Sequence, residues 1–154
     1  MGLSLEFYAG DAVAIGKEFT AFKLQSLRDG TKALAYADFS LHLSPTDLDI
    51  LSDVIAERIG AEPLALNDCF SRNVGGTEGE SGAEVVDPAW VRMVAQTEEA
   101  WTPELASEWI KRVGVEYGQQ LELTPEAVRA VQELIRLARL AIRQGVDVVH
   151  TWYL

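Results

Sequence analysis

Residues 124–154 read TPEAVRAVQELIRLARLAIRQGVDVVHTWYL, and this stretch decides the fold. Thr124 followed by Pro125 is typical of a helix start, because the threonine side chain accepts a backbone N–H and proline at the first position loses no hydrogen bond. Gly145 is the residue type that ends helices in the left-handed conformation. The segment therefore predicts a helix over 125–144. Its apolar face is continuous and consists of Val128, Val131, Leu134, Ile135, Ala138 and Ile142.

Strand patterns occur directly after this helix and near the start of the chain. Residues 146–154 are rich in β-branched and aromatic side chains, which favours a final strand. Residues 3–8 and 33–43 alternate between apolar and polar side chains, the period of a half-buried strand. We expect at least three strands, with the long last helix and the strand after it at the centre of the fold.

Three further helix-start signals that contain proline occur in the middle of the chain. Ser44-Pro45, Asp87-Pro88 and Thr102-Pro103 each place a capping residue before a proline. These signals predict helices over 45–59, 88–97 and 103–117, the first ending at Gly60 and the third at Gly118. Asp11 is a candidate cap for another helix bearing Ile15, Phe19 and Phe22.

The fold class that follows is α+β, a small sheet with four to five helices packed mainly on one face. The chain has 154 residues, the usual size of one domain, and we expect a single globular domain over 1–154. Residues 67–84 contain four glycines and three glutamates and predict a flexible loop. Such a loop is either a simple connector or a segment that becomes ordered when a partner binds.

The order of parts resembles the YfbM-like family of small bacterial α+β proteins. The matching features are the opening Met1-Gly2 strand, Gly75-Gly76 followed by Val85-Val86-Asp87-Pro88, and the closing long helix, Gly145 and terminal strand. These features cover about half of the chain. The resemblance implies a fold and no particular activity.

Charge and cysteine content exclude several classes of function. The net charge is −11, and such a field repels phosphate backbones and anionic lipid, so nucleic acid and membrane surfaces are not expected partners. No apolar run approaches the roughly 20 residues of a membrane span. Cys69 is the single cysteine, which favours a reduced, cytoplasmic compartment and an inert buried thiol.

The histidines are the main candidates for chemistry. Asp38 and His42 fall on one face of a predicted strand, about 13 Å apart at roughly 3.3 Å per residue, too far for a triad with Ser40. If the strands of His42 and His150 are neighbours, the two rings and Asp38 form an acid–base or metal site. The alternative is that both histidines are structural or surface residues. We expect no cofactor and no resident metal.

Acidic residues are the candidates for binding. Residues 1–124 carry 9 basic and 21 acidic side chains, whereas residues 125–154 carry 4 and 3. Asp49, Asp53 and Glu57 recur every four residues on one helix face, a spacing that costs helix stability through like-charge repulsion. The stripe serves either solubility or a basic partner. Further binding candidates are Trp101, in a connection between helices, and Glu78 and Glu80 of the predicted loop.

These features lead to three functional hypotheses. The first is a non-catalytic intracellular module that binds another protein with a basic surface, without nucleic acid or membrane. The second is a small hydrolase or metal-dependent enzyme that uses His42, His150 and Asp38. The third is a homo-oligomeric structural protein with a self-complementary aromatic surface.

Overall fold

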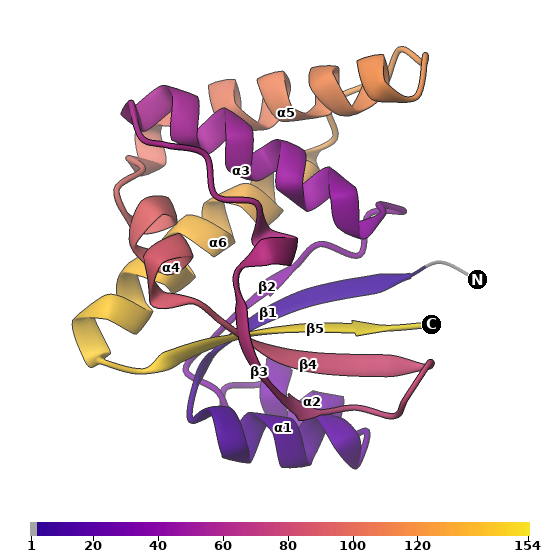
Figure 1. Cartoon of the computed structure of the whole chain (residues 1–154), viewed down its shortest axis with the longest axis vertical. Helices are drawn as coiled ribbons and strands as arrows, with labels where there is room; N and C mark the ends of the chain where they lie inside the picture. Colours follow the sequence, from indigo (N-terminus) through magenta and orange to yellow (C-terminus); the bar gives the residue numbers. More distant parts are fainter. Residues whose placement is uncertain (1–2) are drawn as a thin grey trace.

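The computed structural model describes residues 3–154 and contains a five-stranded antiparallel sheet in the order β2-β1-β5-β4-β3 (Figure 1). The strands are β1 (Ser4–Gly10), β2 (Ala35–Asp38), β3 (Phe70–Gly75), β4 (Ser81–Val86) and β5 (Asp147–Tyr153). The α+β class is confirmed. β5 lies between β1 and β4, so the strand that follows the long last helix is the central strand of the sheet.

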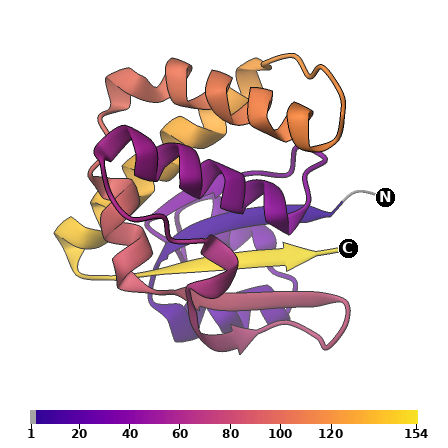
Figure 2. The same ribbon diagram turned by 45° about the horizontal axis from the view of Figure 1, so that its top comes forward.

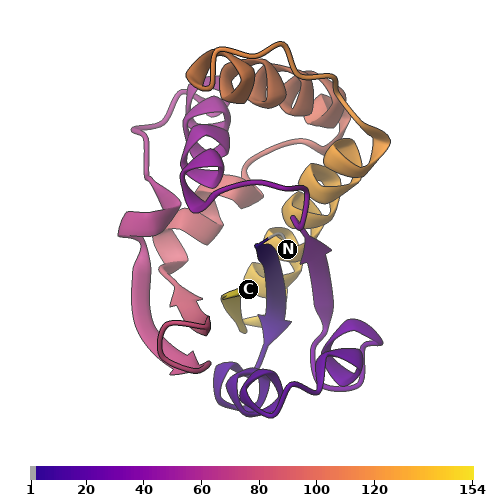
Figure 3. The same ribbon diagram turned by 90° about the vertical axis from the view of Figure 1, so that its right-hand side faces the viewer.

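Four helices cover one face of the sheet. They are α3 (Pro45–Ile59), α4 (Pro88–Ala95), α5 (Thr102–Glu116) and α6 (Pro125–Gln144). The short helices α1 (Ala12–Thr20) and α2 (Leu24–Arg28) lie on the opposite face (Figures 1 and 3). Two 3-10 turns, η1 (Leu66–Asp68) and η2 (Glu99–Trp101), connect elements on the face that carries α3 to α6.

The helix starts and stops agree closely with the sequence signals. The Thr124 side chain accepts a hydrogen bond from the Ala127 N–H, and α6 ends at Gly145 with φ 67°. α3 likewise ends at Gly60 with φ 71°. Asp11 caps α1, but this helix stops at Thr20, and Phe22 lies beyond it as an exposed residue with φ 57°.

Two strand predictions need correction. The strand expected over 33–43 is limited to Ala35–Asp38, because the chain turns away from the sheet toward α3 and His42 adopts φ 61°. The opening strand agrees with β1, although Met1 and Gly2 lie outside the described residues.

The prediction of a flexible loop over 67–84 is wrong, because this segment contains η1, β3 and most of β4. Its glycines allow close approach and tight turning. A Cβ on Gly75 would lie 2.6 Å from the Gly16 carbonyl oxygen of α1, and Gly76 has φ 103°. β3 also carries two register shifts against β4, which is typical of an edge strand protected from pairing with other chains.

An aromatic cluster forms the middle of the larger core. Phe7 of the sheet stacks on Trp90 and meets Phe39 edge-on. The Trp90 indole donates to Ser52 Oγ at 3.0 Å, and the Trp109 indole donates to the Asp47 carbonyl oxygen at 2.8 Å. These bonds join α3 to α4 and α5, so the position of the first turn of α3 is set by the core.

The smaller core under α1 and α2 contains a buried ion pair that the sequence analysis did not identify. Side chains alternate along a strand, so Glu6 and Tyr8 of β1 face away from Phe7. The Glu6 carboxylate accepts hydrogen bonds from the Tyr8 hydroxyl and from Arg28 of α2. Arg28 also donates to the Tyr153 hydroxyl at 2.9 Å, which attaches α2 to the sheet.

Candidate functional site

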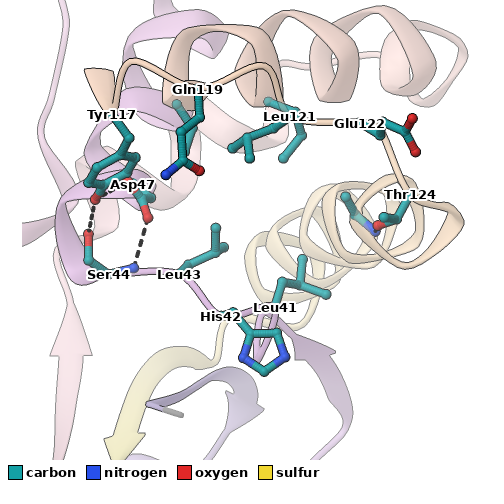
Figure 4. Close-up of a pocket in the computed structure, with 13 residues that line it drawn as sticks. Leu41, His42, Leu43, Ser44, Asp47, Tyr117, Gln119, Leu121, Glu122 and Thr124 are labelled. Atoms are coloured by element: carbon teal, nitrogen blue, oxygen red, sulfur yellow. Dashed lines mark hydrogen bonds between the residues drawn. The ribbon is translucent and has the colours of Figure 1, made fainter. Parts of the chain in front are cut away.

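A cavity of about 540 Å³ opens between the start of α3, the end of α5 and the start of α6. This volume lies within the range of about 300–1,000 Å³ that is usual for small-ligand pockets. Polar groups lie at both ends: Ser44, Asp47 and Tyr117 at one end, Glu122 and Thr124 at the other (Figure 4). The apolar part of the wall consists of Leu41, Leu43, Ile110, Val113, Leu121 and Ala127.

Glycines at the end of α5 shape one wall of this cavity. Gly118, with φ 63°, ends the helix, and the Gln119 N–H turns back to donate to the Gly114 carbonyl at 2.8 Å. A Cβ on Gly114 would lie 2.5 Å from the Gln119 carbonyl oxygen. This helix ending therefore requires glycine at both positions, and it directs residues 119–124 along the mouth of the cavity.

A chain of hydrogen bonds links α3 to α5 at one end of the cavity. Asp47 is 2% exposed, and its carboxylate accepts from the Ser44 N–H at 2.8 Å and from the Tyr117 hydroxyl at 3.0 Å. Because the Tyr117 proton is used in this way, Ser44 Oγ, 2.9 Å away, donates to the Tyr117 oxygen. Both donors to Asp47 are neutral, and no ion pair among residues 3–154 includes this carboxylate.

The charge of the cavity wall is negative. The lining residues include the carboxylates of Asp47 and Glu122 but neither lysine nor arginine. The helix dipole at the first turn of α3 favours the Asp47 charge, but a dipole end is weaker than a full countercharge. The lining also includes the exposed side chains of Tyr117 and Leu121.

The three predicted catalytic candidates lie in separate surroundings. His42 is exposed and lines the cavity described above, whereas His150 is buried and lines a different cavity. Asp38 lies at the exposed end of β2, where it accepts from the Ser40 N–H at 2.8 Å. No group of three metal-binding side chains occurs within residues 3–154, and no hydrogen bond there joins His42 to Ser44 or Asp47.

The predicted acidic stripe on α3 makes contacts within the molecule. Asp49 accepts from the backbone and side-chain amides of Asn67, which holds η1 against α3. Glu57 pairs with Arg112 of α5, and this guanidinium lowers the pKa of the Glu57 carboxyl. Asp53 is exposed. Two of the three carboxylates therefore support the packing of α3.

The other predicted binding residues are distributed over distant parts of the molecule. Glu78 and Glu80 are exposed at the turn of the β3–β4 hairpin. Trp101 is half-buried against the larger core, and Arg58 covers its ring at 4.5 Å. Cys69 is buried, and burial together with nearby aspartates raises the pKa of its thiol, which opposes a nucleophilic role.

Among the polar residues that line this cavity, Asp47, Glu122, Tyr117 and Gln119 were not predicted as site residues. The contact of Asp47 with Tyr117 spans 70 positions along the chain. No local pattern identifies such a pair. The helix-ending signal at Gly118 marks the turn that places Tyr117 and Gln119 at the cavity.

Comparison with models of protein families, with curated proteins and with solved structures finds no match for the chain. The resemblance to the YfbM-like family therefore stays a prediction. Within residues 3–154, no helix has the length and apolar character needed to cross a membrane.

Proposed function

We propose that the protein is a non-catalytic binding module that takes a basic side chain of another protein into the cavity between α3, α5 and α6. The observation that carries the proposal is the buried Asp47 carboxylate, which meets only neutral donors in a cavity without lysine or arginine. A buried charge without a countercharge is costly, so a cation entering the cavity gains a favourable interaction.

The apolar part of the site favours an arginine or lysine over a small inorganic cation. These side chains combine an apolar stem with a charged head. The leucines at positions 41, 43 and 121 form a surface for the stem, and Asp47 and Glu122 attract the head. The exposed Tyr117 ring of the lining extends the apolar surface toward neighbouring residues of the same partner.

The overall charge supports the same class of partner. With a net charge of −11, the protein attracts basic surfaces over the distance of a Debye length, about 8 Å at physiological salt. Such attraction raises association rates and weakens as salt rises.

Two capped dipeptides test this function directly: acetyl-Leu-Arg-amide, and acetyl-Leu-citrulline-amide, which has nearly the same shape without the charge. We expect saturable NMR shift changes at residues 41–47 and 117–124 with the arginine peptide, with a Kd of about 1 mM, equivalent to roughly −4 kcal/mol. Citrulline should bind several-fold more weakly, and added salt should reduce the difference.

Two variants test whether a carboxylate of the cavity wall causes the preference for the charged peptide. Glu122→Gln should weaken arginine binding. Glu126→Gln changes an exposed acid in the first turn of α6 that does not line the cavity, and it should alter binding little. Equal binding of the two peptides, or shifts that map elsewhere, would show that the proposed function is wrong.

A further inference from the structure

A second cavity, of about 330 Å³, lies on the same face of the sheet, where β1 and β5 pass the start of α3 and η1. Figure 2 shows α3 crossing above the sheet, and η1 packs against α3. Its wall is mostly apolar and is formed by Leu3, Leu5, Pro45, Phe70 and Trp152, together with Asn67, whose side-chain amide donates to Pro45 and Asp49. No lysine, arginine or carboxylate lines it.

His150 supplies a buried polar group to this cavity. The residue is 2% exposed, and its ring lies between Phe7 and Phe70, with centroid distances of 4.5 and 5.8 Å. Its Nδ1 is 3.0 Å from the Glu6 carbonyl oxygen. A carbonyl only accepts, so Nδ1 carries the proton and the ring is held in one tautomer.

The other ring nitrogen, Nε2, is then a hydrogen-bond acceptor. Desolvation by burial lowers the pKa of His150 to about 4, so the ring is neutral at pH 7 and Nε2 carries no proton. Within residues 3–154, no donor binds Nε2. The fully enclosed side-chain atoms without partners there are the hydroxyls of Thr97 and Thr151, so Nε2 reaches accessible space, and His150 lines the cavity.

Trp152 forms a rigid wall next to this acceptor. A Cβ on Gly82 of β4 would lie 2.3 Å from the Trp152 indole nitrogen, so the indole lies directly over the glycine. Glycine at this position therefore allows the flat ring to line the cavity. A mostly apolar cavity with an oriented acceptor selects for shape and for a hydrogen-bond donor.

We propose that this cavity binds a small neutral aromatic molecule with one hydroxyl group, which donates a hydrogen bond to His150 Nε2. The volume lies at the lower end of the range for ligand sites and suits one or two rings. A charged ligand would enter without a countercharge from the wall, which disfavours it. This site is separate from the proposed cation-binding cavity and does not depend on it.

Phenol and toluene test the proposal, since they differ by a hydroxyl in place of a methyl group. We expect phenol to bind the full chain at pH 7, shifting the indole N–H signal of Trp152, which is assigned with Trp152→Phe. Toluene should bind about two- to tenfold more weakly, the range expected for one hydrogen bond.

Two variants separate the acceptor from the cavity. His150→Phe keeps an aromatic ring without Nε2 and should remove the preference for phenol, while Leu3→Trp should fill the mouth and weaken both probes. The comparison of phenol with toluene on the unmodified chain tests the proposal even if a variant fails to fold. Equal affinity for phenol and toluene, or saturable binding of neither at Trp152, would overturn the proposal.

Discussion

Buried polar side chains show how single residues are accommodated in this fold. Glu6 is 1% exposed and forms an ion pair with Arg28, while His150 stays neutral and donates to a backbone carbonyl. The Tyr8 hydroxyl donates to Glu6, and burial raises the pKa of this phenol. Glu6 and His150 find partners far away in sequence, whereas Tyr8 donates to a residue two positions away on its own strand.

His150 should make the protein less stable in mild acid. Its pKa is about 4 in the folded state and about 6.5 in an unfolded chain, so between these pH values the unfolded state binds more protons. Stability therefore rises with pH across this window and is lost as the pH falls, by about 2 kcal/mol at pH 5. Urea unfolding at pH 7 and pH 5 measures the loss.

The control for this prediction is His150→Phe, in which the carboxylates are unchanged. The pH dependence of its unfolding free energy should be smaller by the contribution of the histidine. The NMR signals of the His150 ring give an independent measurement, and titration near pH 6.5 in the folded protein would contradict the prediction.

Among the secondary-structure elements, α1 packs unusually close to the edge strand β3. A Cβ on Gly16 of α1 would lie 2.1 Å from the Val74 carbonyl oxygen. Thr20 of the same helix donates from its hydroxyl to the Gly16 carbonyl, and its oxygen accepts from the Gly76 N–H at 3.0 Å. Glycine in the middle of α1 thus permits the close approach of a helix to an edge strand.

Gly16→Ala should destabilise the protein although alanine favours helices. The gain in helix propensity is about 1 kcal/mol, whereas the added methyl group meets a backbone atom and forces α1 away from β3. We expect a net loss of about 1–3 kcal/mol or more in urea unfolding. Lys17→Ala, at an exposed neighbouring position, should stay within about 0.5 kcal/mol of the unmodified protein. Similar stability of both variants would show that the helix is not held in this position.

The whole molecule depends on β5. This strand forms seven residue pairs with β1 and five with β4, and it is the only link between the pair β2-β1 and the pair β4-β3 within the described sheet. β1 and β5 are more than 130 residues apart along the chain. The sheet is therefore completed by contacts of long sequence separation, which slow folding.

Removal of residues 147–154 should abolish cooperative unfolding, because the sheet loses its central strand and the larger core is exposed on one side. Urea denaturation followed by near-UV circular dichroism checks this expectation. Removal of Leu154 alone, an exposed residue whose N–H donates to the Glu80 carbonyl, should cost at most about 1 kcal/mol. A cooperative transition in the longer truncation would show that the sheet forms without β5.

The sequence by itself determined the elements that have local signals. Pro125 and Gly145 define α6, and Pro45 and Gly60 define α3, because capping and glycine conformations depend on neighbouring residues alone. The α+β class followed from these helices, from the period-two alternation at β1 and β2, and from the β-branched and aromatic side chains of β5.

Only the tertiary structure decided the rest. Segment 67–84 resembles a loop in composition, but Gly16 and Gly75 approach each other across 59 positions and make it part of the sheet. The contact of Asp47 with Tyr117 and the separation of His42 from His150 likewise depend on how the helices and strands pack. Strand order and cavity walls are made by residues distant in sequence, and no local pattern carries that information.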